Sequence, residues 1–399
     1  MAANKERIPT THVGSLVRPP ALREFLSAMR DRAPYDEQAF EACLRDSVLE
    51  VVRRQQQAGI DIVSDGEFGK PILWNAYINE RLTGVEKEPK DPSQPSAPFP
   101  PANDARLFPE FWAEYAGTQG WDRDDVVGFR VTGPIAYDGH AAITRDIANL
   151  KAALEQVDVL DGFLTAVAPA SVPGIRWQEA YATEEEFLYA IADALHEEYR
   201  LIIDSGLLLQ VDDAFIPWMY DLMVPPATLE DYRRWAASRI EILNHALRGL
   251  PSERIRYHIC WGSFNAPHVG DVPAEDIIDI VFGVNAGAYA IEMANPRHEH
   301  EWRLWEDVTL PEGKVLIPGV ISHATNVVEH PRLVAERIER LALLVGRENL
   351  AGGTDCGFAQ GPFVQRVHPT IQWAKLESLA EGARIASGRL WGAPAPAPA

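Results

Sequence analysis

Short apolar runs alternate with amphipathic, helix-like stretches along most of the chain. This alternation is typical of α/β proteins in which helices connect parallel strands. The helical pattern is clearest over 184–205, 229–247 and 331–345. Nine apolar runs read as buried strands, and they end within 11–15, 61–67, 129–135, 163–169, 207–213, 256–262, 288–295, 315–322 and 350–357.

Polar and reactive residues cluster at the carboxyl ends of these runs. In a TIM-type (β/α)8 barrel, that end of the strands carries the active site. An open doubly wound sheet also binds ligands there, but usually through a glycine-rich phosphate turn, and the sequence contains neither GxGxxG nor GxxxxGK[ST]. We therefore predict an α/β TIM-type barrel. Such a barrel has eight strands, and the sequence offers nine candidates. The first or the third candidate is therefore expected to lie outside the closed sheet.

The same rhythm predicts the domain organisation. We expect residues 1–390 to form a single catalytic barrel domain. Residues 84–125 interrupt the rhythm with prolines and aromatic residues. We predict that they form an excursion near the barrel mouth, because loops of this length are usually functional or disordered. The Ala/Pro-rich end, 391–399, is predicted to be disordered.

Composition narrows the class of protein. Of 399 residues, 46% are hydrophobic and 24% charged, as in ordinary soluble globular proteins. The net charge of −21 leaves no basic excess for phosphates, which argues against nucleic-acid binding. Three cysteines without a local framework favour a reducing compartment over a disulfide-stapled fold. With no signal-like or membrane-spanning apolar segment, we predict a cytoplasmic protein without a membrane partner. A homo-oligomer is compatible with the sequence.

One set of residue types points to a metal. His258 and Cys260 stand at i and i+2 in one strand, so their side chains share a face. Glu292 follows the next strand and Cys356 the last. One imidazole, two thiolates and one carboxylate suit Zn²⁺, whereas magnesium or calcium would not select sulfur. Taken singly, each residue is more readily a core residue or a helix cap. Taken together at strand ends, they predict a zinc site.

The motifs that carry these residues, RYHICWG, YAIEMAN and TDCGF, follow THVGS near the start of the chain. In this order they resemble the catalytic barrel of the cobalamin-independent methionine synthase family, which includes core-type methionine synthases and epoxyalkane:coenzyme M transferases. The resemblance covers nearly the whole chain. It implies a zinc-dependent thiol methyltransferase that transfers a methyl group from a donor such as 5-methyltetrahydrofolate to homocysteine, giving methionine.

The resemblance also implies a proton donor for the leaving group. His323, in PGVISHATN, matches the family's proton-donating histidine. An ordinary imidazole pKa of about 6.5 suits that role. A helix-capping or solvated loop histidine is the alternative interpretation, and His330 is the second candidate for the proton donor.

The substrate-binding residues that the resemblance implies are Val13, Ser15, Glu67, Asp212 and Trp177. Glu67 in SDGEF and Asp212 in QVDDAF match carboxylates that bind the homocysteine ammonium. The THVGS segment matches a loop whose backbone binds the amino-acid carboxylate, and Trp177 matches a pterin-stacking tryptophan. Paired buried carboxylates are costly unless a cation joins them, which also favours an ammonium-bearing thiol.

Two other functions stay open. The thiol and electrophile could differ, as in epoxide opening by coenzyme M, whose sulfonate would need cations such as Arg18 or Arg176. The acids Glu67 and Asp212 argue against that thiol. A non-catalytic zinc barrel is the third function, because structural zinc sites are normally closed by four protein ligands.

Overall fold

The computed structural model describes residues 6–88, 102–118, 128–172, 175–177 and 179–392. The predicted disordered end, 391–399, falls almost entirely outside the described residues. So do parts of the predicted excursion at 84–125.

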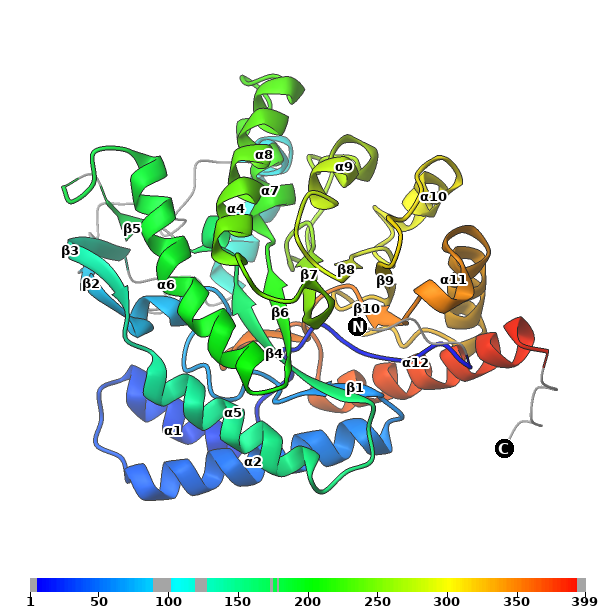
Figure 1. Cartoon of the computed structure of the whole chain (residues 1–399), viewed down its shortest axis with the longest axis horizontal. Helices are drawn as coiled ribbons and strands as arrows, with labels where there is room; N and C mark the ends of the chain where they lie inside the picture. The colour runs from blue at the N-terminus through cyan, green and yellow to red at the C-terminus, as the bar shows by residue number, and fades with distance from the viewer. Residues whose placement is uncertain (1–5, 89–101, 119–127, 173–174, 178, 393–399) are drawn as a thin grey trace.

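The centre of the molecule is a parallel sheet of seven strands (Figure 1). In sheet order they are β1 (Ile62–Ser64), β4 (Asp161–Val167), β6 (Leu208–Asp212), β7 (Ile255–Ile259), β8 (Ala288–Ile291), β9 (Val315–Ile321) and β10 (Gly353–Thr354). Single parallel bridges join Thr11 to Ile62 at one edge of the sheet and Thr10 to Gly352 at the other. Because one short segment reaches both edges, the sheet is curled, as in TIM-like folds.

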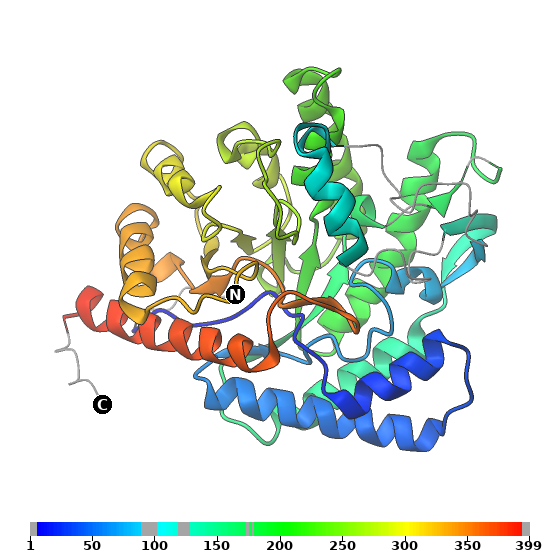
Figure 2. The same cartoon turned by 180° about the vertical axis from the view of Figure 1, so that it is seen from behind.

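Helices cover the outer face of this sheet (Figures 1 and 2). They are α1 (Pro20–Arg30), α2 (Glu37–Gln57), α5 (His140–Leu154), α6 (Glu184–Asp204), α7 (Phe215–Met223), α8 (Leu229–Ala246), α9 (Ile278–Val281), α10 (Leu304–Asp307), α11 (Pro331–Val345) and α12 (Pro369–Leu390). The three predicted helical stretches are confirmed as α6, α8 and α11. A capping box between Thr228 and Asp231 fixes the start of α8. None of the helices in the described ranges is long and apolar enough to span a bilayer.

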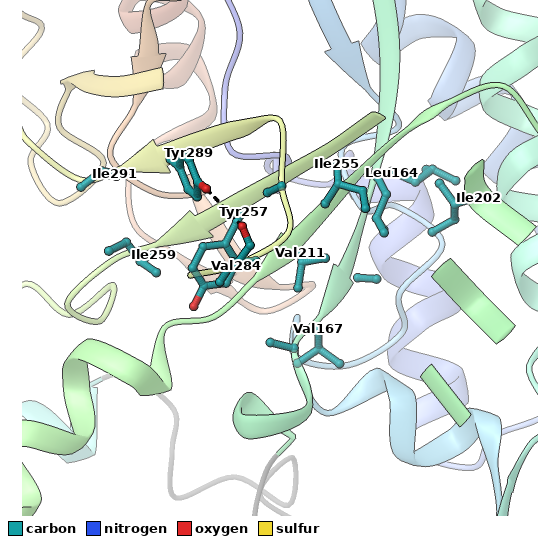
Figure 3. Packing of buried hydrophobic residues seen from close by; sticks show 14 of the residues in the cluster. Leu164, Val167, Ile202, Val211, Ile255, Tyr257, Ile259, Val284, Tyr289 and Ile291 are labelled. Atoms are coloured by element: carbon teal, nitrogen blue, oxygen red, sulfur yellow. Dashed lines mark hydrogen bonds between the residues drawn. The ribbon is translucent and has the colours of Figure 1, made fainter. Parts of the chain in front are cut away.

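Side chains alternate between two faces along the strands. Val211, Tyr257, Ile259 and Ile291 join a large apolar cluster between the sheet and the helices (Figure 3). The intervening positions of β8 and β9 belong to a separate small cluster that also contains Ala351. Since successive strand residues point to opposite faces, the second set lines the inside of the curl. The inner face is therefore where alternate polar residues converge.

A second, smaller sheet lies outside the main one. It contains β2 (Leu82–Glu88), β3 (Gly128–Tyr137) and β5 (Ile175–Arg176). The third predicted strand, 129–135, therefore lies outside the main sheet, which is one of the two expected alternatives. The first, 11–15, is not a strand of that sheet either and contributes only the single bridge of Thr11. The remaining elements are the helices α3 (Asn103–Leu107) and α4 (Pro109–Thr118) and a hairpin of β11 (Ala359–Gly361) and β12 (Val364–Gln365).

A buried ion network ties this second sheet to the helices. Arg81, at the end of a 3-10 helix (Tyr77–Arg81), donates to Glu198 of α6 at 3.0 Å and to Asp146 of α5 at 2.9 Å. The hydroxyls of Tyr77 and Tyr137 also donate to Glu198. The arginine therefore compensates two buried carboxylates at once.

Removing this cation should destabilise the fold. In Arg81→Ala, Glu198 would stay buried without a cation and Asp146 would keep only Arg145. Breaking a buried pair in this way costs about 3–5 kcal/mol. Urea unfolding followed by circular dichroism measures the change. Arg200→Ala is the control, because Arg200 pairs with Glu197 and Asp204 on the surface of α6 and should matter little. Equal effects of the two substitutions would contradict this role for Arg81.

Candidate functional site

Two cysteines and one histidine meet on the inner face at the carboxyl end of the sheet. His258 lies on β7, Cys260 follows it two positions later, and Cys356 comes just after β10. The two sulfur atoms are 3.6 Å apart. One ligand atom from each of the three residues lies within 4.8 Å of the others, and all three side chains are buried. The structure thus brings together three of the four predicted zinc ligands.

The His258 ring is oriented to act as a ligand. Its Nδ1 lies 3.2 Å from the carbonyl oxygen of Ala290, so we assign the proton to Nδ1. Its Nε2 is buried and has no partner among the described residues. Burial lowers the pKa of His258 to about 3, so the ring is neutral. A carbonyl that fixes the tautomer and frees the other nitrogen is the usual arrangement around a metal-bound histidine.

The surroundings of Cys260 favour its protonated thiol, whereas a bound cation would favour the thiolate. The contact with Cys356, followed by burial, raises the pKa of Cys260 well above its usual value. The charge of Glu292 raises it further. Thiolates are the metal-binding form, so a bound cation would have to displace protons here. The donor set therefore fits Zn²⁺, which accepts one nitrogen and two sulfurs and leaves a fourth position open.

Glu292, the fourth predicted ligand, lies beside this trio in a second group. Its ligand oxygen lies within 4.8 Å of ligand atoms from His323 and Asp355. The amide N–H of Trp261 donates to its Oε2 at 3.0 Å, and Asn295 donates to its Oε1. Burial raises the pKa of Glu292. The charges of His268 and His298 oppose this effect of burial and lower the pKa of Glu292.

His323 is the most isolated polar side chain of the site. It is fully buried, and neither ring nitrogen has a partner in the described parts of the chain. Burial, reinforced by nearby cations such as Arg366, lowers its pKa well below the usual value. His330, the second candidate, is exposed and caps α11 through the amide of Arg332. His323 is thus the histidine positioned for chemistry.

The sequence prediction missed Asp355. Its Oδ1 accepts the amide N–H groups of Met293 and Ala294 at 2.8 and 2.7 Å, whereas its Oδ2 has no partner among the described residues. Burial and the charge of Glu292 raise its pKa well above the usual value. Its position directly before Cys356 in TDCGF was the available signal.

The two predicted ammonium-binding acids also lie close together. The charge of Glu67, second to burial, raises the pKa of Asp212 well above its usual value. Gln210 donates to Asp212 Oδ1 at 2.7 Å. Glu67 Oε2 and Gln210 Oε1 are both buried and lack donors within the described ranges. Two unsatisfied acceptors beside a second acid make this acid cluster of Glu67, Gln210 and Asp212 a region that needs hydrogen-bond donors.

Lys70, a cation of the chain itself, already contacts this acid cluster. Lys70 Nζ lies 3.1 Å from Glu67 Oε1 and 2.7 Å from the hydroxyl of Thr165, which also donates to the same carboxylate oxygen. Its charge lowers the pKa of Asp212, against the larger effects of burial and Glu67. Lys70 and Thr165 were not predicted from the sequence. They leave only one of the two Glu67 oxygens for a ligand.

The predicted carboxylate-binding loop runs beside the acid cluster. The carbonyl oxygen of Val13 accepts from Gln210, and its amide donates to Thr354 at 3.2 Å. The hydroxyl of Ser15 accepts from Arg18 at 3.2 Å. Arg18 also donates to the carbonyl oxygen of Glu67 at 2.7 Å. The loop and the acid cluster therefore form one connected region.

The predicted pterin-stacking residue already contacts an aromatic ring of the protein. Trp177 follows β5 and stacks on Phe187 of α6, with ring centroids 6.1 Å apart. Other aromatic rings gather at the loop that follows Cys260. Phe264, in this loop, packs against Trp218 of α7 and Trp112 of α4. The hydroxyl of Tyr115 on α4 accepts from the amide of Asn265 in the same loop. Part of the predicted excursion thus contacts the loop that follows Cys260.

Comparisons with known proteins show similarity to methionine synthases. No protein-family model matches the chain. A methionine synthase of Sulfolobus acidocaldarius is 22% identical over 88% of this chain and 85% of its own length. A methionine synthase of Thermococcus kodakarensis is 22% identical over 95% of this chain and 93% of its own length.

A solved structure shares the fold. A B12-independent methionine synthase from Shewanella, in complex with selenomethionine, superposes with a TM-score of 0.68. The match covers 97% of this chain and 99% of that chain, at 20% sequence identity. The predicted resemblance is confirmed by these relatives over nearly the whole chain. The chain is thus similar to cobalamin-independent methionine synthases over nearly its whole length.

Proposed function

We propose that this protein is a zinc-dependent S-methyltransferase that converts homocysteine to methionine. The observation that carries the proposal is the trio of His258, Cys260 and Cys356, whose ligand atoms converge within 4.8 Å. Structural zinc sites are closed by four protein ligands, whereas catalytic sites keep a position for substrate. A set of three protein ligands on the inner face suits a catalytic zinc site. Glu292 would complete the coordination in the resting enzyme and yield to the incoming thiol.

A zinc ion bound here would lower the pKa of the substrate thiol and favour the thiolate nucleophile. The surrounding residues would hold the rest of the amino acid. Glu67 Oε2 and Asp212 are proposed to bind its ammonium, supported by the unsatisfied acceptors of this acid cluster. Val13 and Ser15 would bind its carboxylate. This division places the amino-acid end in the region next to the metal ligands.

Proton transfer would fall to His323. Methyl transfer forms a sulfur–carbon bond and breaks the bond between the methyl group and the donor. The thiol loses a proton, and a departing nitrogen, as in 5-methyltetrahydrofolate, must gain one. His323 is buried, and neither of its ring nitrogens has a partner among the described residues. A neutral imidazole could take the thiol proton and deliver it to the leaving group.

The methyl donor would enter from the mouth above the metal ligands. The resemblance assigns pterin stacking to Trp177. The rings of Trp112, Trp218 and Phe264 offer a second aromatic surface at the loop that follows Cys260. We propose that the described part of the 84–125 excursion helps to enclose this mouth.

The proposal extends to architecture and compartment. The bridges of Thr10 and Thr11 to the two sheet edges support an eight-position (β/α)8 barrel, within one catalytic domain at 1–390. Two free thiols 3.6 Å apart require reducing conditions, which fits the predicted cytoplasm.

A second function is favoured by one observation. Lys70 already neutralises part of the acid cluster, so a thiol without an ammonium is a real competitor. Zinc-dependent opening of an epoxide by a coenzyme M-type thiol would use the same metal ligands. Arg18, a buried cation that donates to the carbonyl oxygen of Glu67, could meet a sulfonate. A panel of thiols separates the two functions.

Zinc binding should depend on the two inner cysteines. Protein purified without chelator should contain about one zinc per chain, and Cys260→Ser or Cys356→Ser should lose most of it. Zinc should also protect Cys260 and Cys356, but not Cys43, from iodoacetamide. Metal analysis and peptide mass spectrometry measure both effects. Cys43→Ser is the control, because Cys43 is on α2. Wild-type protein without zinc would refute the proposed site.

Methionine formation tests the activity itself. The zinc protein should methylate homocysteine with at least one donor from a panel of methylfolates and a methylated corrinoid, detected by mass spectrometry. His323→Ala should keep its zinc and turn over about 100-fold more slowly or worse, the usual contribution of a general acid–base. Normal turnover by this variant would remove His323 from the reaction.

Thiol selectivity tests ammonium binding by the acid cluster. Glu67→Gln should raise the KM for homocysteine about 10- to 100-fold, since a charge-assisted hydrogen bond contributes about 1.5–3 kcal/mol. It should affect coenzyme M much less. Asp161→Asn is the control, because Asp161 pairs with Arg254 at the amino end of β4. Equal losses for the two thiols with Glu67→Gln would contradict ammonium binding.

A further inference from the structure

A second cluster of buried charged side chains lies behind the metal ligands. It joins the loop after β7, which carries His268 and Asp271, to the segment after β8, which carries His298 and Glu301. Asp271 Oδ2 lies 2.8 Å from His268 Nδ1 and 2.9 Å from His298 Nε2. His298 Nδ1 lies 2.9 Å from Glu301 Oε2. Neither histidine was predicted as a site residue.

The geometry fixes the protonation of both histidines. His268 Nε2 faces the carbonyl oxygen of Phe264 at 2.9 Å, so all four ring nitrogens of the pair face oxygen acceptors. A neutral imidazole has a single N–H and would leave one nitrogen lone pair against an oxygen. Both rings are therefore imidazolium cations. Burial alone would lower their pKa values, but the carboxylates outweigh it and raise them to about 9 for His268 and about 10 for His298.

One of these cations reaches the metal site through a tryptophan. The His298 ring stacks on Trp261, with centroids 4.1 Å apart and planes at 25°. Trp261 directly follows Cys260, and its amide N–H donates to Glu292 Oε2 at 3.0 Å. Its indole N–H donates to the carbonyl oxygen of Val272 at 2.7 Å. Both ends of Trp261 are therefore fixed, and a stacked cation on an indole face is attractive.

The two loops are also connected at the backbone. Arg297 donates to the carbonyl oxygen of His268 at 3.0 Å. Asp104 of α3 accepts the amide N–H groups of His268 and Val269 at 2.9 and 3.0 Å. The loop after β7 is thus held from two sides, and both Arg297 and His298 connect it to the segment that follows Glu292.

We propose that His298 is a positioning residue for the metal site: its imidazolium, held between Asp271 and Glu301, fixes Trp261 and thereby sets the orientation of Cys260 and Glu292 around the zinc. This inference rests on the proposed zinc site. Partners of this kind typically change metal affinity 10- to 100-fold.

The test measures zinc affinity and ligand geometry rather than turnover. His298→Gln keeps a hydrogen-bond donor but removes the charge and the aromatic ring. It should weaken zinc binding about 10- to 100-fold in competition with a chromogenic chelator. In the cobalt(II)-substituted protein, the ligand-field bands should shift while the sulfur-to-cobalt charge-transfer bands remain. His298→Phe keeps the ring without the charge and should fall between His298→Gln and wild type.

The control is a histidine–aspartate pair remote from the site. His245 on α8 contacts Asp193 of α6 at 2.7 Å, and His245→Ala should leave zinc affinity and the cobalt spectrum unchanged. If His298→Gln lowers the melting temperature but leaves both metal readouts at the wild-type values, the residue is merely structural and the inference is overturned. If the wild-type protein itself binds no zinc, the proposed function fails, and this inference fails with it.

Discussion

The site depends on one constraint: alternate side chains of parallel strands converge inside a curled sheet, where water cannot solvate them. On β7 this places His258 and Cys260 on the inner face, while Tyr257 and Ile259 pack against the helices. The inner positions would be apolar if the fold alone decided them, as Ala290 and its neighbours are. Polar groups there are costly unless something binds them.

Buried polar atoms that lack hydrogen-bond partners in the described residues indicate which ligands would bind here. Nε2 of His258, which has no hydrogen-bond partner in the described residues, points to a metal ion. Unsatisfied oxygens on Glu67 and Gln210 point to a ligand with N–H donors. The two regions are joined through the loop of Val13, which contacts Gln210 on one side and Thr354 on the other. A thiol bearing an amino acid would satisfy both regions at once.

Sequence pattern predicted the fold class and most of the inner-face residues, because strand periodicity and motif order are local. His258, Cys260 and Cys356 could be placed in this way. The pattern could not separate Glu292 from that trio, since the distance between strand ends depends on how the sheet curls. Lys70 was missed because it reaches Glu67 only through an unusual turn, in which Glu67 itself has a φ of +61°.

Longer-range relations were also invisible in the sequence. His268 and His298 lie in separate loops, and only the folded chain brings them to the same carboxylate. Trp177 was assigned by resemblance, yet its stacking partner is Phe187, a contact set by how β5 meets α6. Such contacts depend on tertiary packing, which single-sequence patterns do not encode.

X-ray absorption at the zinc edge, with and without homocysteine, tests the central claim most directly. The account predicts two sulfur neighbours and lighter atoms in the resting protein, with one further sulfur joining at about 2.3 Å when homocysteine binds. A zinc shell that gains no sulfur, or that contains no sulfur in the resting protein, would contradict it.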